Sequence, residues 1–213
     1  MGWQDLHRRI LEQGGAMDWG AALTPGVLPY LEGRGRVLDL GCGQGHDSLR
    51  LARLGFHAVG LDLSGEALER ARAAAREEGL GARFVQGDMS QGLPFPGGAF
   101  DAVLANLSLH YFDHATRRFV LAEVGRVLVA GGVLALHVNS SLEAERRRAE
   151  GAAMQELEPG FYLEEAGVQR CYFDREMLEE WLAGWEVLRL EPLEVLNASG
   201  KPKRCWRAVA RPG

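Results

Sequence analysis

Cysteine is scarce in this sequence: Cys42, Cys171 and Cys205 are the only three among 213 residues. No two of them stand at the spacing of zinc ligands, and an odd number argues against a disulfide framework. We therefore expect neither a metal site nor a disulfide-stabilised secreted domain. So low a cysteine content fits a reducing compartment, and the predicted location is the cytoplasm.

Long apolar runs are missing as well. No stretch approaches the ~20 apolar residues that a membrane-spanning helix needs. Residues 1–15 are too polar to form the apolar core of a signal peptide, because they include Asp5, Arg8, Arg9 and Glu12. The sequence therefore predicts no membrane association.

No basic run dominates the chain, whose formal net charge is −5. Composition thus gives no electrostatic reason to expect a nucleic-acid partner. The longest basic stretch, Arg146–Arg148, is flanked by glutamates, and we interpret it as the solvated face of a helix, with a site for a substrate anion as the alternative. The length and the 46% hydrophobic content suit a single globular domain over residues 1–213. The sequence does not determine the oligomeric state.

Short apolar segments alternate with amphipathic ones between residues 36 and 138. The pattern predicts strands at 36–40, 56–61, 83–86, 100–105 and 133–138, and helices at 46–54, 64–79 and 115–128. Strands joined through helices imply parallel βαβ units. This part of the chain is therefore expected to form a Rossmann-like, doubly wound α/β sheet.

The two ends of the chain depart from this alternation. Helices are predicted at 3–13 and from Thr24-Pro25 to about Glu32, so N-terminal helices occupy residues 1–34. Residues 141–156 have a polar, helical composition, and we expect 141–170 to form a cap insertion over the ligand pocket. A helix at 175–183 precedes strands at 185–196 and 204–210, which a four-residue turn, Asn197–Gly200, makes antiparallel. The predicted sheet has seven strands and is mostly parallel, with an antiparallel last strand.

A glycine loop, Asp39-Leu40-Gly41-Cys42-Gly43-Gln44-Gly45, stands between the first strand and the first helix of the sheet. Glycines let a ligand approach the backbone closely, and the following helix presents its positive end there. The spacing is G-x-G-x-G, whereas dinucleotide-binding proteins carry G-x-G-x-x-G, and position 46 is a histidine. The spacing therefore favours a ligand without a pyrophosphate over NAD.

Two acids follow the next two strands. Asp62 ends the second strand, where a carboxylate can accept hydrogen bonds from both hydroxyls of a ribose. Asp88 follows the third strand and can accept from an adenine amino group, with Met89 and Leu63 on the two faces of the ring. The alternatives are a loop acid beside a helix cap for Asp62 and a solvated turn acid for Asp88.

Together these features resemble a known family. Val37–Gly45 resembles motif I of the class I S-adenosylmethionine (SAM)-dependent methyltransferases, and Asp62 and Asp88 match the acids that bind ribose and adenine in that family. Phe100–His110 and Leu128–Leu134 resemble its fourth strand and its glycine turn. The resemblance implies SAM as methyl donor, S-adenosylhomocysteine as product, and a cofactor site at Asp39, Gly41, Cys42, Gly43, Gly45, Asp62, Leu63, Asp88, Met89, Ala105, Asn106 and Leu107.

The acceptor is less closely defined. Asn106–Leu109 replaces the Asn/Asp-Pro-Pro-aromatic motif of adenine amino methyltransferases, and no Pro-Cys pair follows the fourth strand. Trp19-Gly20, His46-Asp47-Ser48 and Tyr172-Phe173-Asp174 resemble tellurite-resistance methyltransferases and in part the ubiquinone/menaquinone type. This resemblance implies a small-molecule acceptor with an oxygen, nitrogen, sulfur or chalcogen nucleophile.

The sequence identifies no catalytic residue. His110, after the fourth strand, and His137, near the end of the fifth, are candidates for a general base, because imidazole titrates near neutral pH. The alternative for each is a packing role. An NAD(P)-dependent oxidoreductase and a non-catalytic SAM-binding protein stay open as alternative functions.

Overall fold

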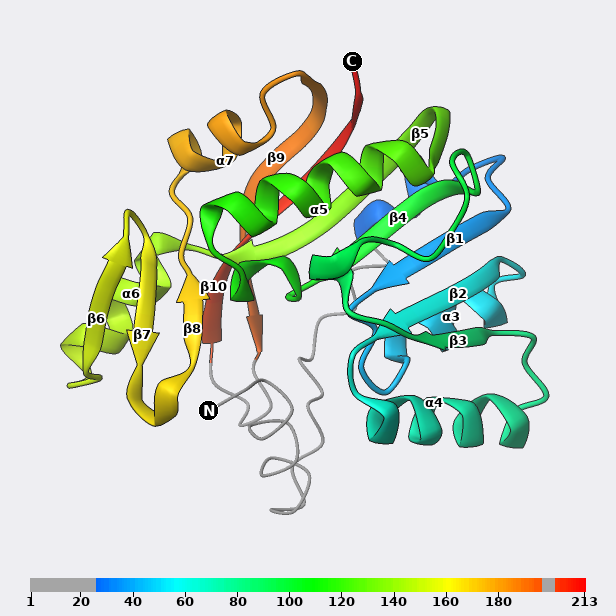
Figure 1. Ribbon diagram of the computed structural model, residues 1–213, viewed down its shortest axis with the longest axis horizontal. Helices are drawn as coiled ribbons and strands as arrows, with labels where there is room; N and C mark the ends of the chain where they lie inside the picture. The colour runs from blue at the N-terminus through cyan, green and yellow to red at the C-terminus, as the bar shows by residue number, and fades with distance from the viewer. Residues whose placement is uncertain (1–25, 197–201) are drawn as a thin grey trace.

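A seven-stranded sheet forms the centre of the computed structural model, which describes residues 26–196 and 202–213 (Figure 1). Its strand order is β3-β2-β1-β4-β5-β10-β9. Strands β1 to β5 pair in parallel, and β10 runs antiparallel to both of its neighbours. The predicted α/β sheet, mostly parallel with an antiparallel last strand, is confirmed. The strands are β1 (Arg36–Leu40), β2 (His57–Asp62), β3 (Arg83–Gln86), β4 (Phe100–Asn106), β5 (Leu128–Asn139), β9 (Trp185–Leu196) and β10 (Pro202–Pro212).

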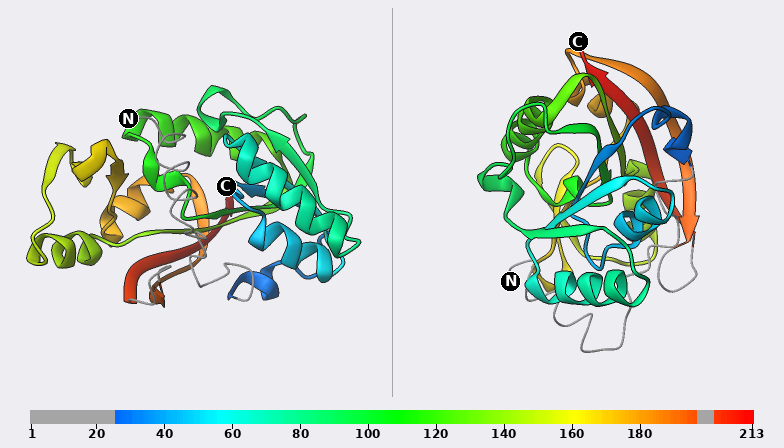
Figure 2. Two further views of the ribbon diagram at one scale, coloured as in Figure 1. Left: turned by 90° about the horizontal axis from the view of Figure 1, so that it is seen from below. Right: turned by 90° about the vertical axis from the view of Figure 1, so that its right-hand side faces the viewer.

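Helices cover both faces of the sheet (Figures 1 and 2). One face packs against α5 (His114–Val127) and α7 (Arg175–Trp181), and the other against α3 (His46–Arg53) and the segment around Leu31. Helix α4 (Gly65–Glu77) begins where Ser64 Oγ accepts a hydrogen bond from the backbone N–H of Ala67. None of the helices within residues 26–196 and 202–213 is long and apolar enough to cross a membrane.

The N-terminal part of the chain differs from the predicted helix over Thr24–Glu32. Residues 28–30 form a short 3-10 helix, η1 (Leu28–Tyr30), and not a continuing α-helix. Pro29 is the physical reason, because it has no N–H to donate into an α-helical ladder. The predicted helix at 3–13, the cap at Thr24-Pro25 and the turn at 197–200 lie outside the described residues.

The segment after β5 contains strands that the sequence did not predict. Helix α6 (Ser141–Ala149) ends just before Gly151, whose φ is +89°. A three-stranded antiparallel sheet then follows, with strands β6 (Met154–Glu158), β7 (Phe161–Glu164) and β8 (Gln169–Cys171). The expected helix over 150–156 is therefore wrong. This small sheet and α6 lie together beyond one end of the main sheet (Figures 1 and 2).

The arginines of α6 are also more engaged than the sequence indicated. Arg147 forms an ion pair of 2.8 Å with Glu164 of β7, whose side chain is only 3% exposed. The guanidinium of Arg148 lies 4.5 Å from the ring centroid of Tyr162, also in β7. The interpretation of Arg146–Arg148 as a solvated face therefore fits Arg148, which is exposed, but not Arg147, because α6 packs against a sheet that the sequence did not reveal.

Asp101, near the start of β4, binds the segment that leads into β1. Its Oδ2 accepts hydrogen bonds from the backbone N–H groups of Gly35 (3.0 Å) and Arg36 (2.8 Å), and its Oδ1 accepts one from the Arg36 side chain (3.1 Å). Burial opposes ionisation of this carboxyl group, but the hydrogen bonds from Arg36 and Gly35 prevail and lower the pKa of Asp101 to about 2.

This pKa leads to a pH-dependent prediction. An aspartate in an unfolded chain has a pKa of about 3.9. The hydrogen-bonded carboxylate therefore stabilises the fold fully above pH ~4, and its contribution is lost as the pH falls from ~4 to ~2. We expect Asp101→Asn to lower the free energy of unfolding by about 1–2 kcal/mol at pH 7, and by progressively less in acid. Urea unfolding of both proteins at several pH values measures this, and a difference that stays constant down to pH ~2.5 would contradict it.

Candidate functional site

The glycine loop connects β1 to α3, and its three glycines have different surroundings. Gly41, Gly43 and Gly45 all have positive φ, of 75°, 52° and 81°. A Cβ on Gly41 would lie 2.4 Å from Cβ of Ser108, and one on Gly45 would lie 2.9 Å from Cβ of Ala71. Around Gly43 no atom lies within 4 Å of that position. Gly41 and Gly45 thus allow neighbouring side chains to pack closely against the loop, whereas the backbone at Gly43 stays accessible to a ligand.

Asp62 links the end of β2 to the glycine loop. Its Oδ2 accepts a hydrogen bond from the backbone N–H of Gly43 and its Oδ1 one from that of Ser64, both at 2.8 Å. The residue is 7% exposed. Because each carboxylate oxygen has two acceptor positions, Asp62 keeps capacity for the hydroxyls of a ligand. The structure thus places the predicted ribose acid beside the loop and also gives it a role in shaping that loop.

Two further acids lie close to this loop. Asp39 is buried at the end of β1 and accepts a hydrogen bond of 2.6 Å from Ser48 Oγ. Burial, together with the negative charge of Asp47 and a smaller effect of Asp62, raises the pKa of Asp39 to about 7, although the Ser48 hydrogen bond opposes this. Three carboxyl groups around one open loop favour a ligand that carries positive charge.

Asp88 and Met89 follow β3, and Met89 reaches the glycine loop. Asp88 Oδ1 accepts hydrogen bonds from the backbone N–H (2.9 Å) and Oγ (2.6 Å) of Ser90, and it caps the short helix η2 (Met89–Gln91). Met89 is buried, and its Cε lies 3.4 Å from where a Cβ on Gly41 would be. Leu63 is half-buried directly after Asp62. Met89 therefore borders the glycine loop, and the contact of Asp88, Met89 and Leu63 with an adenine ring stays a prediction.

The end of β4 completes this edge of the sheet. Leu107 has φ of +53° and is the only non-glycine residue with positive φ in the described part of the chain. A left-handed backbone is strained for a residue with a side chain. Such strain persists where the surrounding structure fixes the conformation, which is often the case at functional sites. Here the backbone N–H of Leu107 donates to the carbonyl of His137 (3.1 Å), and Ser108 Oγ donates to the carbonyl of Leu40 (2.7 Å). Ala105 is buried in β4, and Asn106 Nδ2 donates to Asp47 (2.8 Å).

Cys42 lies inside the loop but is not suited to nucleophilic chemistry. Its Sγ would lie 2.6 Å from a Cβ on Gly60, so the thiol packs against β2. Burial, with the charges of Asp39 and Asp62, raises the pKa of the Cys42 thiol well above its ordinary value. A neutral, packed thiol can border a ligand but cannot attack one.

The structure gives His137 a structural role. Its Nε2 accepts a hydrogen bond of 3.0 Å from Nε of Arg207, whose other nitrogen Nη1 donates to Glu191 (3.0 Å). Burial and the charge of Arg207 lower the pKa of His137 to about 3. Because its basic nitrogen is already engaged, the geometry does not support His137 as a general base.

His110 occupies a different environment, in the short helix η3 (Leu109–Tyr111) after β4. It is fully buried, and its ring centroid lies 4.2 Å from that of Tyr111. Burial, together with the positive charges of Lys203, Arg170 and Arg117, lowers the pKa of His110 well below its ordinary value. Within the described residues neither ring nitrogen has a hydrogen-bond partner. His110 is thus neutral and can hydrogen-bond to a ligand, but it is too weakly basic to remove a proton at neutral pH.

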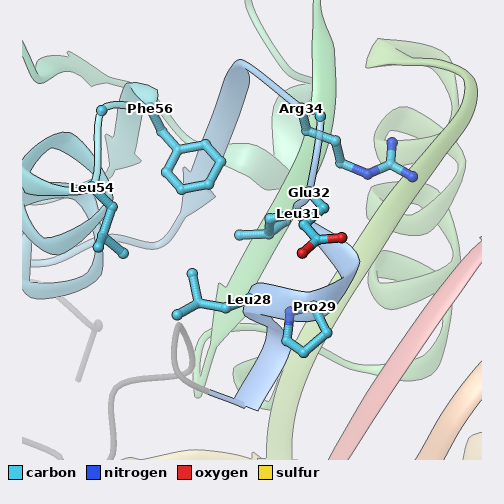
Figure 3. Close-up of a pocket in the computed structure, with 9 residues that line it drawn as sticks. Leu28, Pro29, Leu31, Glu32, Arg34, Leu54 and Phe56 are labelled. Atoms are coloured by element: carbon cyan, nitrogen blue, oxygen red, sulfur yellow. The ribbon is translucent and has the colours of Figure 1, made fainter.

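A separate pocket lies at the opposite, amino-terminal edge of the sheet (Figure 3). It has a volume of about 540 Å³, and Leu28, Leu31, Leu54 and Phe56 supply much of its lining. Arg34, which also borders it, donates to the backbone carbonyls of Tyr30, Asp101 and Gly131. Because this pocket lies before β1 and β2, it is remote from the glycine loop and Asp62 and adds nothing to that site.

Several contacts of the site could not be predicted from the sequence. Asp47 and Ser48 stand in the first turn of α3, and only the fold shows that they reach Asn106 and Asp39. Arg170 and Lys203 come from β8 and β10, and no local motif connects them with η3. Within residues 26–196 and 202–213 no three side chains are grouped as metal ligands.

Comparison with known proteins gives a consistent result. Residues 37–132 match the family model of the methyltransferase domain. An uncharacterized methyltransferase of Synechocystis is 41% identical over 101 residues, which are 47% of this chain and 45% of that protein. The demethylmenaquinone methyltransferase of Thermus thermophilus is 36% identical over 61% of this chain and 58% of its own length. The chain thus spans about half the length of these curated relatives.

Solved structures extend the likeness to nearly the whole chain. A SAM-dependent methyltransferase from Methanosarcina mazei superposes with a TM-score of 0.76 and 27% identity, covering 88% of this chain and 97% of that one. The sheet order, the reversed β10 and the loop after β1 agree with these matches. Residues 37–132 thus match a methyltransferase domain, and the chain shares the fold of a SAM-dependent methyltransferase.

Proposed function

We propose that this protein transfers the methyl group of SAM to a small-molecule acceptor. The observation that carries the proposal is the accessible backbone at Gly43, where no protein atom lies within 4 Å of a Cβ position. Three carboxyl groups lie around this loop, at the C-terminal ends of β1 and β2. SAM carries a positive sulfonium and an ammonium group, and these complement the charges of Asp39, Asp47 and Asp62. The demethylmenaquinone methyltransferase relative is named for a small-molecule acceptor, which supports the same class here.

Each part of the donor has a group suited to it. The methionine part lies along the loop at Gly41 and Gly43, with its ammonium toward Asp39. Asp62 accepts from the ribose hydroxyls, and Asp88 from the adenine amino group, with Met89 and Leu63 on the ring faces. Ala105, Asn106 and Leu107 at the end of β4 border the methyl group, and Cys42 and Gly45 shape the loop.

The bound donor supplies an electrophilic methyl carbon attached to a sulfonium. A nucleophilic atom of the acceptor forms a bond to that carbon as the carbon–sulfur bond breaks, and the electron pair remains on sulfur in S-adenosylhomocysteine. The protein aligns the two molecules and excludes water, and both effects accelerate such an in-line transfer. Neither His110 nor His137 is basic enough to take a proton, so their roles are positional.

We infer that residues 141–170 form the cap that selects the acceptor. β8 packs against η3, directly after the end of β4, and α6 packs against β10. The guanidinium of Arg170 lies 5.5 Å from the ring centroid of Tyr111, which couples the cap to η3. The cap thus adjoins the side of β4 that borders the methyl group. Changes in this segment are expected to alter acceptor preference more than SAM affinity.

The pKa of Asp39 predicts how SAM affinity depends on pH. The ionised carboxylate attracts the donor's ammonium, whereas the protonated form, which dominates below pH ~7, does not. Lowering the pH from 8 to 6 should raise the Kd for SAM about tenfold, and binding near pH 7 should release a proton. Calorimetry in two buffers of different ionisation enthalpy measures both effects. Asp39→Asn should abolish the proton release, and a wild-type Kd that is independent of pH would contradict the assignment.

Two measurements separate this proposal from its alternatives. Thermal shift with SAM and with NAD(P) identifies the cofactor, since a ligand stabilises the fold that binds it. Stabilisation by NAD(P) and not by SAM would indicate an oxidoreductase. An assay for S-adenosylhomocysteine with labelled SAM, thiols, amines, phenols, selenite and tellurite then tests catalysis. SAM binding without product from any acceptor would favour a non-catalytic SAM-binding protein.

A further inference from the structure

Two buried polar side chains lie near the end of β4. His110 of η3 is fully buried, and Asn139 of β5 is 1% exposed. In the described part of the chain, neither ring nitrogen of His110 and neither polar atom of the Asn139 amide has a hydrogen-bond partner. Buried polar groups in folded proteins almost always have partners, so these four atoms together indicate a polar ligand.

Both side chains lie at the same end of the sheet. Asn139 is the last residue of β5 and pairs directly with Cys205 of β10. Directly opposed residues of antiparallel strands share a face of the sheet, and Cys205 packs with Leu107, the residue after β4. The helix η3, which carries His110, packs against β5, and the charge of Lys203 acts on both His110 and Cys205. His110 and Asn139 therefore adjoin the strand end that borders the methyl group in the proposed binding mode.

The imidazole of His110 is neutral. Burial, followed by the positive charges nearby, lowers the pKa of His110 well below its ordinary value. Two of these cations are engaged with protein groups, since Arg170 is paired with Glu164 and Arg117 donates to the backbone carbonyl of Phe112. One nitrogen of a neutral imidazole donates a hydrogen bond and the other accepts one. His110 thus offers one donor and one acceptor to a ligand.

The amide of Asn139 likewise offers both donors and an acceptor. A carboxylate or another oxyanion only accepts hydrogen bonds and a protonated amine only donates them, so either would leave part of the pair unsatisfied. Placing a charge in buried surroundings without an opposite charge is also costly. A hydroxyl group donates one hydrogen bond, accepts two and carries no charge, so it is the group that matches this pair.

Apolar side chains adjoin the pair. Leu107, Val195 and Cys205 are buried and pack with Leu193, in a cluster separate from the main core. Cys205 pairs with Asn139 on one side and with Leu193 on the other, so this cluster extends from β5 across β10 to β9. Such surroundings favour an acceptor with an apolar body over one that is polar throughout.

We propose that His110 and Asn139 form the acceptor subsite, and that the acceptor is an uncharged, largely apolar molecule whose hydroxyl group hydrogen-bonds to both side chains. The inference rests on the proposed function and specifies its acceptor class. Neither side chain is basic enough to take a proton from the hydroxyl at neutral pH, so the hydroxyl serves to anchor the acceptor beside the donor's methyl group.

Calorimetric titration of the chain in the presence of S-adenosylhomocysteine tests the subsite. The probes are 4-ethylphenol, which donates and accepts, 4-ethylanisole, which only accepts, and the anion 4-ethylbenzoate. We expect 4-ethylphenol to bind at least about tenfold more tightly than either of the others, because only its hydroxyl satisfies both side chains. Equal binding of the phenol and the anisole, binding of neither, or tighter binding of the benzoate would overturn the proposal.

Substitutions assign the preference to the two side chains. His110→Leu and Asn139→Leu should each reduce the preference for 4-ethylphenol over 4-ethylanisole to less than about threefold, since leucine forms no side-chain hydrogen bond. His57→Leu makes the same change as His110→Leu at an exposed position, at the start of β2 and thus at the opposite edge of the sheet. It should leave the preference unchanged. A full preference retained in both His110→Leu and Asn139→Leu would overturn the subsite.

Unfolding in urea distinguishes a binding role from a structural one. Because the four polar atoms have no partner within residues 26–196 and 202–213, replacing them breaks no hydrogen bond of the folded chain. The urea midpoints of His110→Leu and Asn139→Leu should therefore equal or exceed that of the wild type, as is common where a residue serves function at the expense of stability. Lower midpoints in both variants would show that protein groups hold these side chains and would overturn the subsite.

Titration with SAM separates this inference from the proposed function. Both variants should bind SAM within about twofold of the wild type, because neither residue is among the groups proposed for the donor. SAM binding without a preference for the phenol would overturn the hydroxyl subsite and leave the proposed function standing. A phenol preference that depends on His110 and Asn139, in a chain that does not bind SAM, would support the hydroxyl site and overturn methyl transfer.

Discussion

Replacing Gly43 by alanine is expected to weaken SAM binding about 30-fold, equivalent to about 2 kcal/mol of binding free energy. Gly43 has φ of +52°, and a Cβ there would project into space that no protein atom occupies within 4 Å. In the proposed binding mode the methionine part of the donor fills that space, so the added methyl group obstructs the ligand directly. The left-handed backbone of an alanine should also cost about 1–2 kcal/mol of folding stability.

A matched variant separates these two effects. Gly79 follows α4 with φ of +65°, and a Cβ there would also have no atom within 4 Å. Gly79→Ala therefore imposes a similar backbone strain at a position remote from the loop. We expect similar losses in unfolding free energy for both variants but a loss of SAM affinity only for Gly43→Ala, as calorimetry would show. Equal SAM affinity in the two variants would refute the proposed position of the donor.

Replacing Phe173 by alanine is expected to lower the free energy of unfolding by about 3–5 kcal/mol. Phe173 is fully buried between β8 and α7, and its ring stacks on that of Trp181 with centroids 5.4 Å apart. Its backbone N–H donates to the backbone carbonyl of Asn139 in β5 (2.9 Å), and its own carbonyl accepts from the backbone N–H of Ser141 (2.7 Å). The residue thus fastens the cap segment to the end of β5, and its removal leaves a cavity at that junction.

Phe119 provides the comparison for this prediction. It lies on α5 and is 45% exposed, so Phe119→Ala removes the same ring from a site where little apolar surface was buried. Urea unfolding should give a loss below about 1 kcal/mol for Phe119→Ala. A Phe173→Ala protein as stable as the Phe119→Ala protein would show that the cap junction does not depend on this ring.

The parts of the fold that were predictable are those with local signals. The strands β1 to β4 are short apolar segments followed by glycine, acid or turn residues, and their helices begin at cap residues such as Ser64 and Asp113. The closing hairpin was predictable because a four-residue turn permits only an antiparallel return. The mostly parallel sheet with a reversed last strand also agrees with the family resemblance.

The cap sheet was not predictable because its strands are stabilised by one another. Four of the five residues of β6 are exposed, so this strand shows no clear alternation of buried and exposed residues. Its strand character comes from pairing with β7, for example Glu156 with Tyr162. Such long-range pairing overrides a polar, helix-like composition.

The candidate site divides in the same way. The glycine loop is contiguous, and Asp62 and Asp88 stand at strand ends that the βα pattern defines, so the sequence predicts all three, and their contacts with the donor stay a proposal. The surroundings of His110 come from separate elements, since Arg170 of β8 lies over the ring of Tyr111 in η3, and only the folded chain shows this.

Calorimetric titration of this chain with SAM, after removal of any bound S-adenosylhomocysteine, tests the central claim most directly. We predict one binding site per chain with a Kd of about 1 µM or below, a binding free energy near about −8 kcal/mol. No detectable binding at about 1 mM SAM, where even a free energy of about −4 kcal/mol would register, would contradict the assignment of this chain's glycine loop as a methyl-donor site.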